Sequence, residues 1–258
     1  MTVKVAAFDI DGTLRRGGDI AAKDIAAIDA WRNAGHLAIS ATGRSRSSLS
    51  RALHGIDISF DYNVLSNGGA GTTRDDELLF GHPIDSDMVH EAVTEFQDVE
   101  GIAVYGTTFG PRDGIFTNNT AIPGVGSSLA QGFIPMTRAD ITDHQFGVVP
   151  LWVPDNPALR VELIERIHTQ LPHATYTTNH EFVDIIAPGV NKGKGILQVM
   201  ELAGIDSFEL YTFGDSWNDL PMHEVAHHSH SFTLSPDDVQ HATDHVIEHV
   251  ADALLEYV

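Results

Sequence analysis

The chain has 258 residues, 42% of them hydrophobic, which is enough to bury one large core or two smaller ones. Its 36 acidic residues against 15 Lys and Arg give a formal charge of −21, which disfavours nucleic acid and anionic membranes as partners. The absence of cysteine excludes disulfides and thiol chemistry and fits a reducing compartment. We see no signal-peptide pattern and no apolar run near the ~18 residues of a membrane helix, so we expect a cytoplasmic protein.

The first apolar run ends in two closely spaced carboxylates, in the segment Phe8-Asp9-Ile10-Asp11-Gly12-Thr13. A run rich in Val and Ala that ends near a Gly predicts a buried strand followed by a sharp turn. Carboxylates two residues apart repel each other unless a cation or a shared proton holds them. Mg²⁺ prefers carboxylate oxygen and usually keeps sites open for phosphate oxygens. The segment therefore indicates phosphoryl chemistry with an Asp nucleophile.

Strand and helix alternate up to about residue 69. The spacing of Ile25, Ile28 and Trp31 predicts the first helix, with Gly35 as its C-cap. Further elements are expected as strands at 37–41 and 62–65 and as a short helix around Leu49. Such alternation predicts a parallel sheet with right-handed crossovers, in which ligands gather at the carboxyl ends of the strands.

The pattern changes between residues 70 and 187, where turns are denser and strands shorter. We expect helices over about 85–97 and 157–171, and β-like runs at 102–105, 147–153 and 182–186. This mixture predicts a separate α+β domain inserted into the first. The alternating pattern resumes with a helix over 193–203 and a strand over 208–213. The expected domains are therefore an α/β core from 1–69 and 188–258, and an insertion from 70–187.

Three further segments carry polar residues suited to a phosphate site. Thr42 offers a hydroxyl, and Gly43 lets backbone N–H groups approach a phosphoryl oxygen. A cation at a helix N-terminus, as expected for Lys192, is tolerable when it points at an anion held there. The last strong strand is followed by a second acidic loop that could complete a cation's ligand set, Gly214-Asp215-Ser216-Trp217-Asn218-Asp219.

In order, these four segments resemble the four motifs of the haloacid dehalogenase superfamily, over residues 3 to about 222. The insertion between the second and third motifs, together with Ser66-Asn67-Gly68, is similar to the Cof-type branch with a C2B cap. This resemblance implies a Rossmann-like core with an inserted α+β cap that sets substrate specificity. It also implies a Mg²⁺-dependent phosphatase of small phosphorylated metabolites that forms an aspartyl-phosphate, with sugar phosphates favoured.

The resemblance implies roles for individual residues. Two carboxylates would carry the chemistry, with Asp9 as nucleophile and Asp11 as general acid and base. The other implied roles are phosphate binding by Thr42, Gly43, Lys192 and Asn218, metal ligation by Asp9, the Asp11 backbone carbonyl and Asp215, and support from Asp219 and Arg44. Asn67, near the entry to the insertion, and Asp184, near its exit, are candidates for substrate contacts. The alternative for them is a structural role, as a turn former and a strand-edge carboxylate.

Two departures from the family pattern leave the subfamily and the substrate open. Ser45 follows Arg44, where the family usually has Pro, and residues 232–235 stand where Asn-Ala is frequent. A phosphomutase or sugar-specific phosphatase of a related C2B-capped branch is one alternative. A non-catalytic metabolite-binding regulator is another, although the intact acidic set argues against it. The sequence does not decide between monomer and dimer.

The C-terminal part is rich in histidine. His241, His245 and His249 have helical i, i+4, i+8 spacing, and such pairs can bind zinc. No further carboxylate or cysteine completes a ligand set there, so we predict a solvated helical face.

Overall fold

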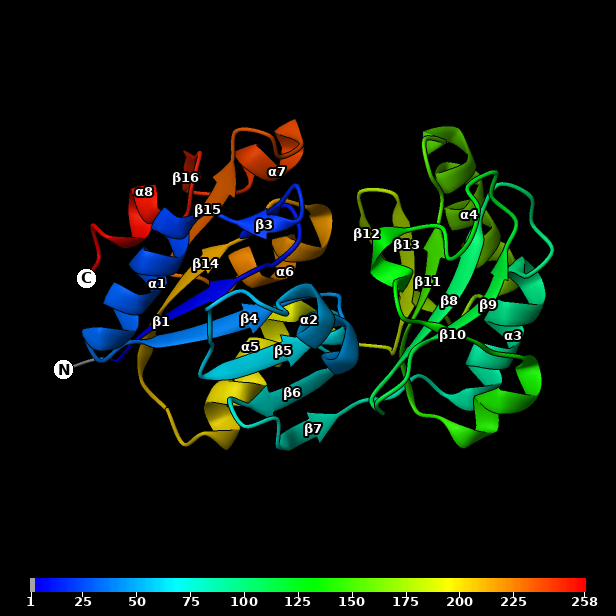
Figure 1. Cartoon of the computed structure of the whole chain (residues 1–258), viewed down its shortest axis with the longest axis horizontal. Coiled ribbons are helices and arrows are strands. Elements are labelled where there is room, and N and C mark those ends of the chain that lie inside the picture. The colour runs from blue at the N-terminus through cyan, green and yellow to red at the C-terminus, as the bar shows by residue number, and fades with distance from the viewer. Residues whose placement is uncertain (1–2) are drawn as a thin grey trace. The chain divides into compact units, whose positions relative to one another are not determined.

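The computed structural model describes residues 3–258, and its internal contacts divide the chain into two units (Figure 1). Unit 1 comprises the chain up to Thr42, Ala52–Phe80 and Asn191–Val258. Unit 2 comprises Gly43–Arg51 and Gly81–Val190. Each unit is built on its own sheet and has its own apolar core.

Unit 1 contains an eight-stranded sheet whose central strands are parallel. Its four middle strands are apolar runs buried on both faces, as expected for a parallel sheet covered by helices. The pairing of β5 with β6 is antiparallel. The strands, in their order across the sheet, are β16 (His245–Ile247), β15 (His228–Phe232), β14 (Phe208–Phe213), β1 (Val3–Phe8), β4 (Leu37–Ala41), β5 (Tyr62–Leu65), β6 (Ala70–Thr73) and β7 (Leu78–Gly81).

Helices cover both faces of this sheet. On one face, α5 (Lys192–Leu202) packs on β4, β5 and β6, with Ile196 and Val199 in the apolar core. On the other, α1 (Ala22–Asn33) lies beside α8 (Ala251–Leu254), as Figure 1 shows. The shorter elements are β2 (Arg15–Arg16), β3 (Asp19–Ile20), η1 (Ser66–Gly68), η4 (Trp217–Asp219), α6 (Leu220–His223) and α7 (Asp237–His241).

Unit 2 pairs a six-stranded, mostly antiparallel sheet with two amphipathic helices. Phe96 from α3 and Ile167 from α4 are fully buried against the sheet, in a core that includes Val149. Short 3-10 turns occur at Ser128–Ala130 and Arg138–Asp143. The sheet order is β10 (Ile134–Pro135), β9 (Gly114–Asn118), β8 (Ala103–Thr108), β11 (Phe146–Trp152), β13 (Phe182–Ile186) and β12 (Thr175–Asn179), and the helices are α2 (Arg46–Ala52), α3 (Ser86–Phe96) and α4 (Pro157–Gln170).

The expected fold class is confirmed as a mixed α/β structure with a parallel-sheet core. Three stretches cluster differently from the expected domain limits, the shortest being residues 188–190, which group with unit 2. Residues 70–80 extend the first sheet through β6 and β7, whereas residues 43–51 cluster with the insertion. The antiparallel pairing of β5 with β6 brings residues 70–80 into the first sheet. Hydrogen bonds from Ser45 and Arg51 to the distant Asp113 join residues 43–51 to the insertion. The functional division into core and specificity cap stays a prediction.

The expected helical arrangement of the three C-terminal histidines is wrong, although His241 and His245 are solvent-exposed as expected. His241 ends α7, His245 begins β16, and His249 lies in the connection to α8. The Thr243-Asp244 turn and the pairing of β16 with β15 override the helical spacing. Among the described residues, the potential metal-binding group is a cluster of three aspartates elsewhere, not these histidines.

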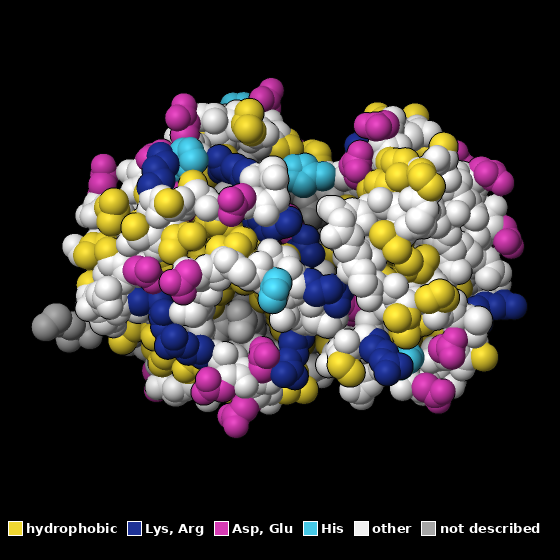
Figure 2. Space-filling model, viewed as in Figure 1, with side chains coloured by type: hydrophobic (Ala, Val, Ile, Leu, Met, Phe, Trp, Pro, Cys, Tyr) yellow, Lys and Arg dark blue, Asp and Glu magenta, His cyan; other side chains and the backbone are white. Residues whose placement is uncertain are grey.

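The acidic surplus is dispersed at the surface. On the face shown in Figure 2, Asp and Glu side chains are scattered over both units and interspersed with Lys and Arg. Within residues 3–258, no helix combines the length and the apolar character that crossing a bilayer requires.

Candidate active site

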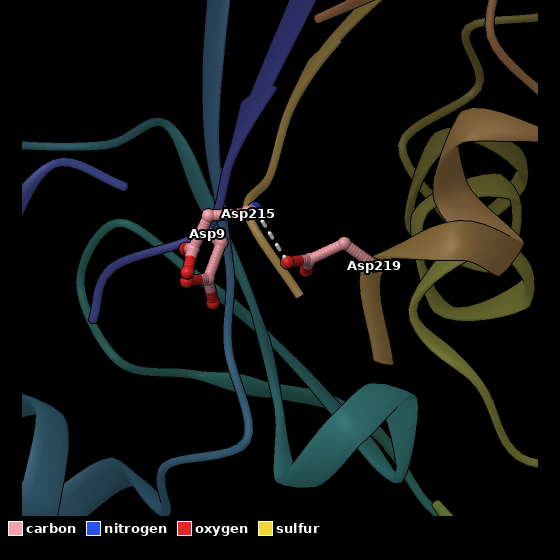
Figure 3. A group of neighbouring side chains, drawn as sticks. All are labelled: Asp9, Asp215 and Asp219. Atoms are coloured by element: carbon pink, nitrogen blue, oxygen red, sulfur yellow. Dashed lines mark hydrogen bonds between the residues drawn. The ribbon is translucent and has the colours of Figure 1, made fainter. Parts of the chain in front are cut away.

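Two carboxylates meet where neighbouring parallel strands end. Asp9 directly follows β1, Asp215 lies two residues beyond β14, and Phe8 is in register with Phe213. The Asp9 backbone N–H continues the ladder by donating to the Phe213 carbonyl at 2.8 Å. Both side chains are buried, at 4% and 5% exposure, and their carboxylates lie next to each other in Figure 3. The sheet therefore brings together two acidic segments about 200 residues apart in the chain.

Gly12 and Thr13 support the Asp215 carboxylate. Gly12 has φ +92°, and a Cβ added there would stand 2.3 Å from Asp215 Oδ2. The Thr13 hydroxyl donates to Asp215 Oδ1 at 2.7 Å. Sequence reasoning did not assign Thr13 a role, although it belongs to the same short motif as Asp9 and Asp11. The turn after β1 thus shapes a close-fitting place for an acidic side chain from another part of the chain.

Lys192 is completely buried between two carboxylates. Its Nζ donates to Asp9 Oδ1 and to Asp219 Oδ1, each at 2.6 Å. Asn191 caps α5 by accepting from the Lys194 N–H at 2.8 Å, which starts the helix at Lys192. Burial alone would lower the pKa of Lys192, but the charges of Asp219 and Asp9 outweigh burial and raise it. Lys192 therefore stays an ammonium ion inside the site.

Asp219 acts as an organiser of the second acidic loop. Its Oδ2 accepts from the backbone N–H groups of Asp215 at 2.9 Å and Ser216 at 3.0 Å, while Oδ1 accepts from Lys192. In Figure 3 its carboxylate points at the Asp215 backbone, across from the other two carboxylates. Three donors already occupy its oxygens, so Asp219 fits a positioning role better than a metal-ligand role.

The neighbouring carboxylates of Asp9 and Asp215 suit a hard divalent cation. One oxygen from each of Asp9, Asp215 and Asp219 lies within 4.8 Å of the others, and all three residues are buried. Three carboxylates face one ammonium ion, so the formal charge of this group is −2 when every residue is ionised. Burial, with the charges of Asp219 and Asp215, raises the pKa of Asp9 well above its usual range despite the opposing pull of Lys192. A cation held by Asp9 and Asp215 would compensate this charge.

Asp11 lies outside the buried cluster. Its side chain is 37% exposed, and its Oδ1 lies 3.5 Å from Arg15 Nη1. Arg15 was not anticipated from the sequence, although its i+4 position after Asp11 was a usable signal. Because the Arg15 backbone pairs with Asp11 across the tight turn, the two side chains are held near each other. A partly exposed carboxyl group can exchange protons with water or a leaving group.

A second turn of the same unit joins the second and fourth motifs. Thr42 is 1% exposed, and its carbonyl accepts from the Asn67 N–H at 3.0 Å. Ser66 and Asn67 have φ of 52° and 55°, a left-handed conformation that costs about 1–3 kcal/mol for non-glycine residues. The Asn67 Oδ1 accepts from Asn218 Nδ2 at 3.0 Å. Asn67 therefore holds Asn218, the predicted phosphate-binding residue.

The remaining candidates belong to unit 2. Gly43 and Arg44 directly follow Thr42, and Arg44 Nη1 donates to the Ser48 hydroxyl at 2.8 Å. Asp184 lies on β13 in register with Pro150 and Thr177, and it is 6% exposed. The structure therefore gathers Asp9, Lys192, Asp215 and Asp219 in one cluster, joins Asn67 to Asn218, and puts Asp184 in the other unit.

This fold and acidic site define a class of protein. The chain belongs to the haloacid dehalogenase-like hydrolase family, whose model matches residues 6–256. A similar solved structure, titled as a subclass IIB sugar phosphatase of this superfamily, has a TM-score of 0.83 at 20% identity, with 99% of each chain covered. At that identity the likeness shows the fold.

Matches to curated relatives cover only part of those proteins. A Streptococcus pyogenes protein, whose name couples a phosphatase with a peptidyl-prolyl cis-trans isomerase, is 23% identical over 97% of this chain and 52% of its own length. The 5-amino-6-(5-phospho-D-ribitylamino)uracil phosphatase of Escherichia coli is 37% identical over 67 residues, 24% of this chain and 25% of its own. The chain therefore spans about half the length of the first relative, and the second match covers a quarter of either protein.

Proposed function

We propose that this chain is a Mg²⁺-dependent phosphatase that hydrolyses small phosphorylated metabolites through an aspartyl-phosphate on Asp9. The observation that carries the proposal is the buried contact of Lys192 Nζ with Asp9 Oδ1, next to the Asp215 carboxylate. A carboxylate, an ammonium ion and a second carboxylate at the carboxyl edge of a parallel sheet suit a nucleophile, a phosphoryl-oxygen ligand and a metal ligand.

Two residues would carry out the bond changes. One oxygen of Asp9 attacks phosphorus, and the bond from phosphorus to the leaving oxygen breaks as the aspartyl-phosphate forms. Asp11 gives its proton to the leaving alkoxide and later accepts a proton from the attacking water. The water oxygen bonds to phosphorus, the bond to Asp9 breaks, and inorganic phosphate leaves with Asp9 restored.

The other residues would bind the phosphoryl group and the metal ion. Lys192 stabilises negative charge on the phosphoryl oxygens, with Thr42, Gly43 and Asn218 as further phosphate ligands. Asp9, Asp215 and the Asp11 backbone carbonyl would hold Mg²⁺, which when bound supplies further charge neutralisation for phosphoryl transfer.

The names of two similar proteins support phosphorylated sugars and sugar alcohols as the substrate class proposed for this chain. One is described as a sugar phosphatase, and the other is named for a phosphate ester of a ribitylamino group. Unit 2 offers Asp184 as a carboxylate suited to substrate hydroxyls, and unit 1 offers Asn67. We propose sugar phosphates first, ahead of flavin mononucleotide and pyridoxal phosphate.

Phosphate release tests this proposal. The compounds assayed are sugar phosphates, 5-amino-6-(5-phospho-D-ribitylamino)uracil, flavin mononucleotide, pyridoxal phosphate and nucleotides. Each is assayed with Mg²⁺ and with EDTA. We expect release from a few of these compounds with Mg²⁺ and none with EDTA. No release by folded protein with Mg²⁺ from any compound would overturn the proposal.

The Asp9→Asn variant tests the nucleophile. It should lose turnover by several powers of ten while it still binds phosphate, because the amide cannot form the ester intermediate. Binding of inorganic phosphate, measured by calorimetry, shows that the site is intact. Retention of more than about a tenth of the wild-type rate would remove Asp9 from this role.

A further inference from the structure

Asp113 is a buried carboxylate that the proposed chemistry does not use. It directly precedes β9 in unit 2 and is 1% exposed. Its Oδ1 accepts from the Thr108 N–H at 3.0 Å. Its Oδ2 accepts from the Ser45 hydroxyl at 2.7 Å, from the Ser47 hydroxyl, and from Arg51 Nη2 at 3.1 Å. A buried carboxylate is costly unless it is fully paired, and this one has four donors.

Three of these four donors come from one short segment, residues 43–51. This segment directly follows Thr42, and it clusters with unit 2 by its contacts. Ser45 precedes α2 and accepts from the Ser48 N–H at 3.1 Å, as a helix N-cap does. The same hydroxyl donates to Asp113, so Ser45 ties the start of α2 to that carboxylate.

The network continues to Arg44. Its Nη1 donates to the Ser48 hydroxyl at 2.8 Å, and the guanidinium is buried with the residue 7% exposed. An unbroken series of hydrogen bonds therefore runs from Asp113 through Ser45 and Ser48 to Arg44. Groups linked in this way depend on one another for their positions.

Ser45 is also a departure from the family pattern, which usually has Pro after the Arg. Pro has no hydroxyl and could neither donate to Asp113 nor accept from the Ser48 N–H. Serine at this position therefore makes two hydrogen bonds that proline could not make.

Covalent geometry places this network beside the proposed phosphate segment. Consecutive Cα atoms are 3.8 Å apart, so the Arg44 Cα lies within about 8 Å of the Thr42 Cα in any arrangement of the two units. Thr42 is held on one side by its N–H bond to the Val64 carbonyl, at 2.9 Å. Ser45 is held on the other side by Asp113. Gly43 and Arg44 lie between these two anchored residues.

We propose that Asp113 is a positioning residue, which fixes residues 43–45 so that the N–H donors of Gly43 and Arg44 are in place before a phosphate ester binds. This inference rests on the proposed function, in which that segment binds the phosphoryl group. Preorganised donors improve binding because less conformational freedom is lost when the ligand arrives. Asp113 itself touches no reacting atom.

The Asp113→Asn variant tests the proposal. Asparagine keeps the shape of the side chain but presents an amide N–H₂ where two hydroxyls and a guanidinium now donate. We expect KM for the preferred ester, and Kd for inorganic phosphate, to rise about tenfold, while kcat stays within about threefold. The matched control is Asp140→Asn, which removes a capping carboxylate at Thr137 in the same unit. It should change stability and leave KM as in the wild type.

A pair of variants at Ser45 gives an independent test that does not depend on the folding of Asp113→Asn. Ser45→Ala removes the hydroxyl and should raise KM. Ser45→Thr keeps a hydroxyl, so its KM should stay close to the wild-type value. A purely structural role would lower the melting temperature of Ser45→Ala without this split between KM and kcat. KM and Kd within about twofold of wild type in Ser45→Ala would overturn the proposal.

The two proposals fail in distinguishable ways. If wild type hydrolyses an ester and the variants match its KM, the positioning role of Asp113 is wrong and the proposed function stands. If wild type hydrolyses nothing but binds inorganic phosphate, and the variants bind it more weakly, the proposed function is wrong and the positioning role stands. If wild type does neither, both are overturned.

Discussion

At the scale of single residues, the site depends on the fully buried Lys192 ammonium ion between two carboxylates. Removing one partner of a buried ion pair leaves the other uncompensated, which typically costs about 3–5 kcal/mol. Asp219 uses its second oxygen to hold the backbone of Asp215, so the same ion pair also orients the proposed metal ligand. A variant that removes the Lys192 charge would therefore also disturb the position of Asp215.

Gly12→Ala should disable the site. The new methyl group would collide with the Asp215 carboxylate, in a backbone conformation that already disfavours alanine. We expect loss of most phosphate-releasing activity and about 2–4 kcal/mol of stability, from strain and overpacking together. Phosphate release and urea unfolding measure the two effects.

Gly17→Ala is the matched control for Gly12→Ala. Gly17 has φ +63° in the same loop region, and a Cβ there would meet nothing within 4 Å. This variant should lose about 1 kcal/mol and keep its activity. Equal activity in the two variants would show that close approach to Asp215 is not what requires glycine at position 12.

At the scale of elements, the start of α5 places the lysine. The Asn191 side chain caps the helix, and its backbone carbonyl lies so close to Gly68 that a Cβ there would stand 2.0 Å away. The helix N-terminus is thereby packed against the turn that carries Asn67. The Asn191 cap and the turn at Gly68 together fix the position of the Lys192 backbone.

Asn191→Ala should lower both stability and activity. Loss of the cap typically costs about 1 kcal/mol, and it loosens the first turn of α5 that carries Lys192. Asn156→Ala is the matched control, because Asn156 caps α4 in unit 2 by accepting from the Leu159 N–H at 3.1 Å. We expect similar shifts in urea midpoint but a reduced kcat in Asn191→Ala alone. An equal kcat in both variants would contradict this role of the cap.

At the scale of the whole molecule, stability is coupled to pH through a buried histidine in the large sheet. His230 on β15 is fully buried, and its ring stacks on Phe213 with 4.5 Å between centroids. Burial lowers its pKa to about 4, despite the hydrogen bond to the Thr212 carbonyl. The folded state therefore binds this proton less readily than the unfolded chain, whose histidine pKa is about 6.5.

Acidification should destabilise the protein through His230. Its stabilising contribution is complete above about pH 6.5 and is lost as the pH falls toward 4, because the unfolded chain takes up the proton first. From pH 7 to pH 5 this loss is about 2 kcal/mol. Urea unfolding measures the free energy of unfolding at pH 7 and at pH 5. The difference between these two values should be smaller in His230→Phe than in the wild type, because phenylalanine keeps an aromatic ring but cannot titrate. In the control His54→Phe, at an exposed position, the change in unfolding free energy between the two pH values should equal that of the wild type. The same change in His230→Phe would contradict the role of His230 in the pH dependence.

Much of the fold could be predicted because its signals are local. Strands at Leu37–Ala41, Tyr62–Leu65, Phe182–Ile186 and Phe208–Phe213 have the expected bounds. Each is an apolar run bounded by turn residues, a pattern contained within a few positions. The Asn156 cap was likewise visible in the residues themselves. The histidine spacing misled because strand pairing outweighs a helical period carried by only three residues.

By itself, the sequence indicated the family, the main strands and helices of both units, and the acidic segments around Asp9 and Asp215 that meet in the structure. Only the tertiary structure decided that Lys192 joins Asp9 to Asp219 and that Asp113 anchors the segment after Thr42. The physical reason is separation along the chain. A local pattern reports which element a segment forms, whereas partners tens to hundreds of residues apart are chosen by the packing and hydrogen bonding of the folded molecule.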